Sequence, residues 1–295
     1  MSVPRPQRGR RTTRHSPAPA ALIAVGVLIA VGVLALSACS APPALPAEGT
    51  GSSATVALPP AGALPDYQLG GAYDPPEGVG VVGRDRSAEP AAGLYSVCYV
   101  NGFQTQPGEL DTWPDDLLLH DGDEVVFDPD WPDEALLDTG SAEQRSRIAE
   151  IVVPWIEGCA DADFQAVEFD NLDSFSRSGG ALRLDDNLAL AELLVDAAHR
   201  VGLAAGQKNA AEHADALKER AGFDFAVTEE CAAYAECGTY TGVYGPHVID
   251  IEYTDQLPRP FAELCADPDT PASTVLRDRD LVTPDDEGYV FAGCP

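Results

Sequence analysis

The sequence predicts an α/β fold with a parallel sheet, arranged either as a barrel or as an open doubly wound sheet. Three observations predict it: strand-like and helix-like segments alternate, the loops between them are short, and four strand-like segments end in polar residues. Repeated strand and helix units of this kind form parallel sheets covered by helices. With 295 residues, 45% of them hydrophobic, the chain can build one sizeable domain or two small ones.

The order of the elements follows from periodicity and from turn residues. Ser141, with Gln144 three residues later, is typical of a helix start, and Gly202 is typical of a helix end. Apolar runs predict strands at residues 67–73, 79–82, 94–103, 124–127, 167–173 (a strand with its turn), 203–209, 223–230 and 247–253. Helical spacing of apolar residues predicts helices at residues 141–158, 184–200 and 211–220.

The N-terminal residues predict an export signal. A basic stretch from Arg5 to Arg14 precedes an apolar run, Ala21 to Leu36, that is too short for a comfortable membrane span. The following LSAC, ending at Cys39, resembles the lipobox of bacterial lipoproteins, in which the chain is cut before a cysteine that carries lipid. We therefore expect a lipoprotein signal peptide at 1–38, lipidation of Cys39 and a flexible tether at 39–64. A plain secretory signal is the alternative.

The chain is strongly acidic. Its formal net charge is -30, and loss of the five arginines before Cys39 would leave the mature chain at about -35. Such a field repels nucleic acid and attracts a cationic ligand, although solubility alone is an equally good explanation of the charge. We expect no nucleic-acid partner.

The cysteines predict a disulfide-bonded exported domain. Without Cys39, six remain, an even number. Six cysteines allow 15 pairings, and the sequence does not choose among them. The pairs that we expect are Cys98–Cys159, Cys231–Cys237 and Cys265–Cys294. The five histidines are scattered and no spacing indicates a zinc site, so neither a metal nor a cofactor is expected.

Strand parity selects the side chains that should face a site at the carboxyl ends of the strands, where parallel α/β proteins carry their sites. In residues 223–230, bulky residues such as Phe225 and Val227 are expected to pack outside against helices. That choice turns Glu230, rather than Glu229, inward. The same count turns these side chains inward: Tyr99, Asn101, Glu168, Asp170, Lys208, Asp250 and Glu252.

Asp170 and Glu230 are the candidate catalytic pair, because two separate strands deliver them to one rim. A pair of carboxylates suits glycoside hydrolysis, in which one protonates the leaving oxygen and the other attacks or activates water. Structural roles are the alternatives for their neighbours. Glu168 can pair with Lys208 inside the barrel, and Asp173 can bind backbone amides in its turn.

Four motifs carry a family resemblance: VEFDNLDSF at 167–175, GLAAGQKNA at 202–210, FDFAVTEECAAYAEC at 223–237 and VIDIEYTD at 248–255. In this order and spacing they resemble the endo-α-1,4-polygalactosaminidases of glycoside hydrolase family 114. The resemblance implies a (β/α)8 TIM-like barrel and hydrolysis of α-1,4-linked galactosamine polymers. It also implies a catalytic Asp in the E-x-D-N motif and a catalytic Glu in the E-E-C motif, here Asp170 and, from parity, Glu230. Substrate-binding roles are implied for Tyr99, Lys208, Asn209, Glu252 and Tyr253, to which parity adds Asn101 and Glu168.

The expected organisation is a barrel at 65–255 and a short, disulfide-clipped C-terminal appendage at 256–295. The expected protein is a monomeric glycoside hydrolase on the outer face of the cell membrane, held by its lipid and acting on an amino-sugar polysaccharide. A non-catalytic lipoprotein that binds such a polysaccharide on the same barrel is one alternative. Another is a metal site with oxygen ligands from Glu168, Asp170 and Asp173.

Overall fold

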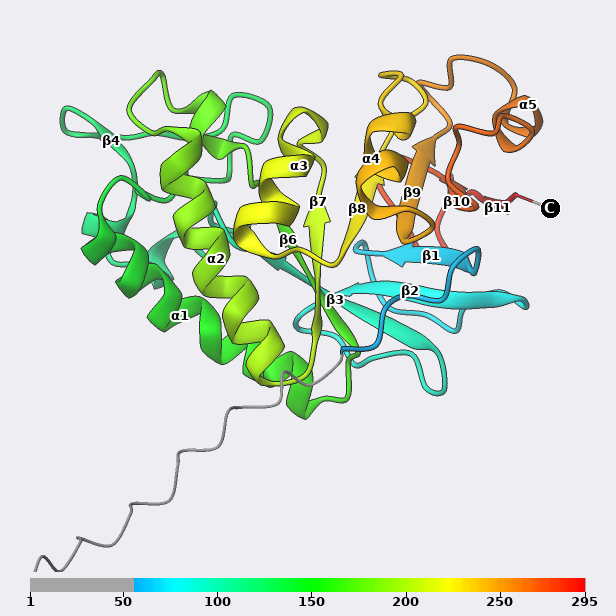
Figure 1. Ribbon diagram of the computed structural model, residues 1–295, viewed down its shortest axis with the longest axis horizontal. Coiled ribbons are helices and arrows are strands. Elements are labelled where there is room, and N and C mark those ends of the chain that lie inside the picture. The colour runs from blue at the N-terminus through cyan, green and yellow to red at the C-terminus, as the bar shows by residue number, and fades with distance from the viewer. Residues whose placement is uncertain (1–55, 295) are drawn as a thin grey trace, which may run out of the picture. The chain divides into compact units, whose positions relative to one another are not determined.

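Residues 56–294 are described by the computed structural model, and they form a barrel of parallel strands with helices on its outside (Figure 1). The α-helices are α1 (Ala142–Asp161), α2 (Leu184–Arg200), α3 (Ala214–Ala216), α4 (Cys237–Tyr244) and α5 (Phe261–Cys265). The strands are β1 (Leu64–Gln68), β2 (Val79–Asp85), β3 (Tyr95–Asn101), β4 (His120–Asp121), β5 (Glu124–Val125), β6 (Ala166–Asp170), β7 (Ala204–Lys208), β8 (Phe225–Glu229), β9 (Val248–Tyr253), β10 (Ser273–Arg277) and β11 (Phe291–Gly293).

The main sheet of these residues has the strand order β1-β2-β3-β6-β7-β8-β9-β10-β11. Each neighbouring pair from β1 to β10 is parallel, and β11 is antiparallel to β10. Arg277, the last residue of β10, donates to the carbonyl oxygen of Tyr67 in β1 and forms an ion pair of 2.9 Å with Asp66. The first and last parallel strands, β1 and β10, therefore lie side by side, and the eight parallel strands close into a barrel. This confirms the predicted TIM-like barrel.

The connections between the strands of the barrel differ along the chain. In Figure 1, α1 and α2 lie against β3, β6 and β7, whereas within the described chain only loops connect β1 to β2 and β2 to β3. The predicted helix at 184–200 is present with the same bounds, and Ser141 caps α1 by accepting a hydrogen bond from the amide of Gln144 at 3.1 Å. Ile148, Val152 and Ile156, spaced by one turn, are fully buried on the inner face of α1.

The inside of the barrel is filled by pairing large side chains with glycines. A Cβ atom added to Gly206 of β7 would lie 2.5 Å from Cζ of Phe225, and one added to Gly83 of β2 would lie 2.6 Å from Cδ2 of Tyr67. Phe225 and Val227 thus point into the barrel, where the small residues of neighbouring strands leave room for them. The predicted parity of 223–230 is therefore wrong, because it assumed that bulky residues belong outside on every strand.

The segment boundaries differ from those predicted at two places. The eighth parallel strand, β10, lies inside 256–295, so this region contributes to the barrel, and α5 and β11 are its additions. Residues 56–63, expected in the flexible tether, contact the barrel: Tyr95 donates to the carbonyl of Ala57 at 2.6 Å, and His247 lies 3.0 Å from the carbonyl of Pro59. The predicted signal peptide at 1–38 and the lipidation site Cys39 lie outside the described residues.

All three expected disulfides are present. They join Cys98 to Cys159, Cys231 to Cys237 and Cys265 to Cys294. In residues 56–294, no helix has the length and apolar character needed to cross a membrane.

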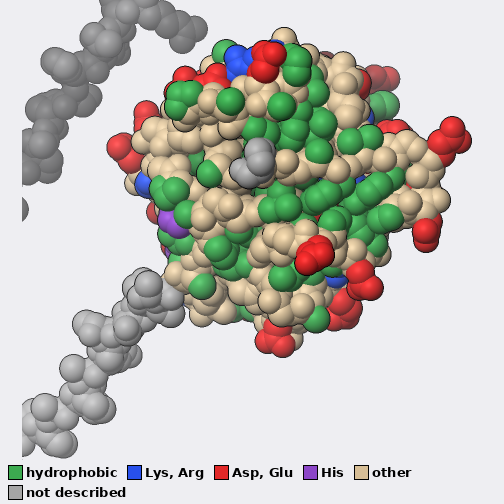
Figure 2. All heavy atoms as spheres, turned by 90° about the vertical axis from the view of Figure 1, so that its right-hand side faces the viewer, with side chains coloured by type: hydrophobic (Ala, Val, Ile, Leu, Met, Phe, Trp, Pro, Cys, Tyr) green, Lys and Arg blue, Asp and Glu red, His purple; other side chains and the backbone are tan. Residues whose placement is uncertain are grey.

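One face of the barrel shows how the charges are distributed. Figure 2 views the side that is at the right of Figure 1: hydrophobic side chains gather across the middle, and acidic side chains stand at the margins. Cationic side chains are sparse on this face. The acidic composition is thus visible at the surface.

Candidate active site

Lys208 is the centre of a cluster of charged side chains at the carboxyl ends of the strands. It is the last residue of β7 and only 2% exposed. Its Nζ lies 3.3 Å from Oε1 of Glu168, 3.2 Å from Oδ2 of Asp170 and 3.2 Å from Oε2 of Glu229. Burial alone would lower the pKa of Lys208, but the surrounding carboxylates, with Asp170 and Glu229 foremost, hold it well above its usual value. Lys208 is therefore a permanent cation shared by three acids.

Asp170 ends β6 and is held by neighbours on both sides. Oδ2 accepts hydrogen bonds from the hydroxyl of Tyr99 at 2.9 Å and from Lys208, while Oδ1 accepts the amide of Asn171 at 2.7 Å. Asn171 has a φ of 62°, a left-handed conformation that turns the chain sharply after the strand. The side chain of Asp170 keeps 19% of its surface exposed, so it is both fixed and reachable from solvent.

Glu229, the last residue of β8, faces the same lysine from the other side. Oε2 accepts a hydrogen bond from Asn209 at 3.0 Å, Oε1 accepts one from the hydroxyl of Tyr253, and 26% of the side chain is exposed. Burial would raise the pKa of Glu229, but Lys208, Tyr253 and Asn209 together hold it below its usual value. Glu229 is thus ionised at neutral pH.

Glu168 lies one step deeper in the barrel than Asp170. It is fully buried and accepts a hydrogen bond of 2.7 Å from the hydroxyl of Tyr67, in addition to its ion pair with Lys208. Burial, helped by repulsion from Asp170 and Glu229, raises the pKa of Glu168 to about 7 even though Lys208 opposes the shift. Because one lysine faces three carboxylates, the cluster retains a proton near neutral pH. The expected pairing of Glu168 with Lys208 is confirmed.

Glu230 points away from this cluster, contrary to the parity prediction. Its side chain is 8% exposed and forms a two-fold ion pair with Arg279, with distances of 2.6 Å and 3.0 Å. The preceding residues face the interior at Phe225, Val227 and Glu229, so Glu230 belongs to the outer set. Its φ of 60° also ends the extended strand at this residue.

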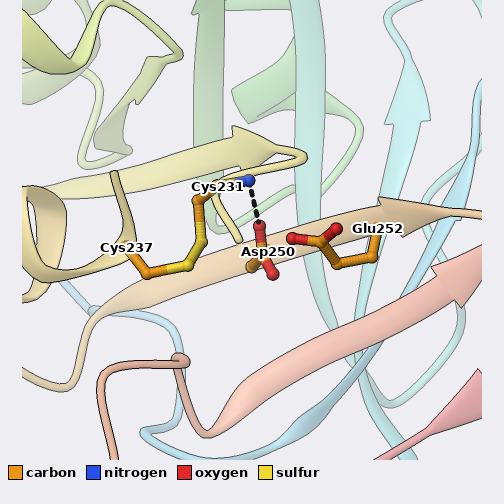
Figure 3. A group of neighbouring side chains, drawn as sticks. All are labelled: Cys231, Cys237, Asp250 and Glu252. Atoms are coloured by element: carbon orange, nitrogen blue, oxygen red, sulfur yellow. Dashed lines mark hydrogen bonds between the residues drawn. A yellow bond between two sulfur atoms is a disulfide. The ribbon is translucent and has the colours of Figure 1, made fainter. Parts of the chain in front are cut away.

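Asp250 and Glu252 are likewise on the outer side of the wall, contrary to prediction, because Ile251 and Tyr253 of β9 fill the interior. Figure 3 shows both acids beside the Cys231–Cys237 disulfide. Asp250 accepts hydrogen bonds from Thr228 at 2.8 Å and from the amide of Cys231 at 3.4 Å, and Glu252 accepts the amide of Ala232 at 2.8 Å. Both acids are fully buried, and burial raises the pKa of each.

Metal-ligating atoms come together at one place in the described residues, and it is this outer position. Cys231, Cys237, Asp250 and Glu252 lie within 4.8 Å of one another, but the two sulfurs are bonded in a disulfide and are not thiolates. Thiolate is the form of cysteine that binds metals, so this set does not suit one. The acids of the alternative metal site do not converge either: Glu168 and Asp170 hold Lys208, and Asp173 pairs with Arg177 at 2.9 Å.

Two polar residues near Asp170 were not among the sequence candidates. Asn171 donates from Nδ2 to Oδ1 of Asn101 at 3.1 Å, and Asn101 donates to Oε2 of Glu134 at 2.9 Å. Glu134 comes from a loop with many acids, and no local pattern sets it apart from Asp130 or Asp133. Asn171 directly follows Asp170, and this position at the end of a predicted strand was the feature of the sequence that could have identified it as a site residue.

Most of the predicted site residues therefore meet at one end of the barrel. Those in contact with Asp170, Glu229 or their partners are Tyr99, Asn101, Glu168, Lys208, Asn209 and Tyr253. In characterised TIM-barrel enzymes, this end of the barrel carries the active site. A pair of carboxylates on separate strands, open to solvent, is the arrangement that most glycoside hydrolases use.

The particular family follows from comparison with known proteins. The profile of Glycoside-hydrolase family GH114 matches residues 46–294, and the chain belongs to this family of glycoside hydrolases. Among solved structures, the chain is similar to Aspergillus fumigatus Ega3 in complex with galactosamine, with a TM-score of 0.66, 23% identity and coverage of 83% of this chain and 100% of that one. The glycoside hydrolase domain of PelA from Pseudomonas aeruginosa gives a TM-score of 0.54, 14% identity and coverage of 77% and 98%. A comparison with curated proteins found no match.

Proposed function

We propose that the protein is an exported, lipid-anchored enzyme that cleaves α-1,4-linked galactosamine-containing polysaccharide, with Asp170 and Glu229 as the catalytic pair. The observation that carries the proposal is the placement of these two carboxylates on either side of Lys208, each open to solvent. Asp170 was the sequence candidate, whereas Glu229 replaces Glu230, which is bound to Arg279. The proposed anchor is Cys39, and the three disulfides agree with an exported domain.

In this mechanism one carboxyl of the pair protonates the glycosidic oxygen and the other, ionised, acts at the anomeric carbon. Lys208 links the two carboxylates, because a change in the charge of one alters the pKa of the other. Repulsion among three carboxylates around one lysine, together with burial, raises the pKa of Glu168 to about 7 and favours one protonated carboxyl in the cluster near neutral pH. Tyr99 and Tyr253 fix the two carboxylates in place.

The geometry favours retention of the anomeric configuration. Oδ2 of Asp170 and Oε2 of Glu229 each lie 3.2 Å from the same nitrogen atom, so they are no farther apart than twice this distance. Inverting enzymes separate their carboxyl groups by roughly 6.5 to 9.5 Å to admit a water molecule, and retaining enzymes by about 5 to 5.5 Å. The two facing oxygens are thus close enough for a retaining pair, and the configuration of the products tests the proposed retention.

The proposed substrate is a galactosamine polymer for two reasons. The family of the chain and the galactosamine complex of Ega3 support an amino-sugar substrate. Free amino groups on such a polymer are cationic, and a protein with a net charge of -30 attracts cations. An open cavity of about 440 Å³ at the ends of β1 and β2, lined by Asp85, Arg86 and Glu109 among others, has the volume to hold further sugar units.

The test is cleavage of purified α-1,4-linked galactosamine polymer, measured as new reducing ends. We expect wild-type protein to shorten the polymer and to release products of retained configuration by NMR. Asp170→Asn should lose at least about a thousandfold in rate while keeping its circular dichroism spectrum. Saturable binding without new reducing ends in the wild type would instead support the non-catalytic polysaccharide-binding alternative and overturn the proposal.

A further inference from the structure

Glu134 is a carboxylate near Asp170 that the proposed mechanism does not use. It lies in the loop before α1, and both of its hydrogen bonds go to one oxygen: Oε2 accepts Nδ2 of Asn101 at 2.9 Å and Nδ2 of Asn171 at 3.5 Å. In the part of the chain that the structure describes, Oε1 has no hydrogen-bond donor. The side chain is thus held through Oε2, and Oε1 can accept a hydrogen bond from a ligand.

The amides that hold Glu134 are themselves fixed by the active site and by an ionic network. Asn171 follows Asp170 directly, and its Oδ1 accepts a hydrogen bond of 3.0 Å from Arg177. Arg177 forms ion pairs with Asp128 at 2.6 Å and with Asp173 at 2.9 Å. Although Glu134 lies in a loop, its side chain is therefore held next to Asp170 by Asn101 and Asn171, which come from distant parts of the sequence.

Within residues 56–294, Glu134 has no ion pair, although Arg177 lies near enough to lower its pKa slightly. Asp170 and Glu229 share Lys208, and Arg177 is committed to two aspartates, whereas no lysine, arginine or histidine of residues 56–294 forms an ion pair with Glu134. A partly buried carboxylate without a counter-ion, beside a second carboxylate, is unfavourable. The consequence is visible in its pKa, which burial and repulsion by Asp170 raise to about 7.

We propose that Glu134 binds the protonated amino group of a galactosamine unit next to the cleavage point and so selects free amines over acetylated ones. A sugar ammonium would supply the missing counter-ion and donate to Oε1. An acetamido group has no charge and offers one amide donor, so it would gain less from the same carboxylate. The proposal rests on the proposed substrate class and adds to it the residue that distinguishes the two forms of the sugar.

The test measures binding separately from cleavage. All variants carry Glu229→Gln to suppress turnover while leaving Asp170 beside Glu134 unchanged, and calorimetry compares α-1,4-linked galactosamine oligomers with fully N-acetylated oligomers of equal length. Adding Glu134→Gln should weaken binding of the free-amine oligomer by about tenfold to a hundredfold and change binding of the acetylated oligomer by less than about twofold. Glu134→Asp, which keeps the charge, should lose less. Glu150→Gln, an exposed acid on α1, is the matched control and should change neither affinity.

A second readout uses the proton that Glu134 carries when the site is empty. The groups that face it are Asp170, Asp128, Arg177 and Tyr99. Ammonium binding favours the ionised form, so the protein with Glu134 should release a larger fraction of a proton per bound oligomer near pH 7 than Glu134→Gln, measured in buffers of different ionisation enthalpy. Its affinity should also fall more steeply with salt.

Two outcomes would overturn the proposal: an equal loss of affinity for both oligomers, or unchanged affinity, proton release and salt dependence in Glu134→Gln. Failure of the proposed function would look different. In that case the wild type would produce no new reducing ends, while the binding comparison between the two oligomers would still give its own answer.

Discussion

Two groups of acids at the ends of neighbouring strands differ in the side of the barrel wall that they occupy. The inner group, Glu168, Asp170 and Glu229, surrounds a lysine, and two of its members reach solvent. The outer group, Asp250 and Glu252, is fully buried beneath the Cys231–Cys237 loop, where hydroxyls and backbone amides hold it. The residue types are alike, so the difference in their charge and in their access to solvent comes from the face of the strand that they occupy.

The inner group has the features that the proposed mechanism requires, and the outer group lacks them. A permanent cation keeps Glu229 ionised, and repulsion among the three inner acids retains a proton. In the outer group, burial raises both pKa values with no cation to oppose it, which favours neutral, structural carboxyls. Acids at the ends of the same sheet therefore separate into an ionic set around Lys208, which carries the proposed catalytic pair, and a buried set without an ion pair among the described residues.

The largest effect is expected from removing the cation of the inner group. Lys208→Met should lower activity by at least about a hundredfold and the free energy of unfolding at pH 7 by about 3 kcal/mol, because three acids lose their shared partner. Lys208 depresses the pKa of Glu229, so the stability that it provides is present above the ordinary glutamate pKa of about 4.3 and is lost as pH falls below it. Urea unfolding of the wild type and the variant at pH 8 and at about pH 3 measures the difference in unfolding free energy and its loss in acid.

Lys218→Met is the matched control for this change, because Lys218 is exposed and stacks on Tyr244 outside the cluster. It should retain full activity and lose roughly 1 kcal/mol or less. If Lys208→Met had the activity and the pH profile of the wild type, the division into inner and outer groups would have no functional meaning.

A smaller effect is expected from the outer group. Asp250→Asn should keep activity within a few-fold, because Asp250 does not touch the inner group. The raised pKa of Asp250 means that the folded state holds a proton that the unfolded state releases, so the wild type loses stability as pH rises above about 4. The amide side chain of the variant does not titrate. As pH rises, the unfolding free energy of the variant should therefore increase relative to that of the wild type by up to about 1.4 kcal/mol per pH unit. Asp133→Asn, at an exposed site, should show no such trend.

The sequence predicted the fold class, the long helices and one half of the candidate site. The three disulfide pairs that we expected are present, although the sequence did not select them among the 15 possible pairings. Strand β6 was straightforward because Val167 and Phe169 are buried toward the helices and leave Glu168 and Asp170 inside. This is the simple alternation between an outer apolar face and an inner polar face. In β7 the predicted inner position of Lys208, on the same face as Ala204, is also observed.

Strands β8 and β9 could not be assigned in this way, because both of their faces are apolar in part. Phe225 faces inward only because Gly206 on the neighbouring strand leaves space for its ring, and this pairing depends on register, which local sequence does not specify. Glu134 was missed for a related reason, since tertiary contacts with Asn101 and Asn171 distinguish it from other loop acids. The family motif E-E-C contains both glutamates, so the motif alone did not choose between them.

The most direct test of this account compares the two adjacent glutamates. Glu229→Gln and Glu230→Gln change the same group at neighbouring positions, and the rate of cleavage of α-1,4-linked galactosamine polymer is measured for both at pH 7. We expect Glu229→Gln to lose at least about a thousandfold in rate, and Glu230→Gln to stay within about tenfold of the wild type with a small loss of stability from its ion pair with Arg279. Loss of activity in Glu230→Gln with retention in Glu229→Gln would contradict the account.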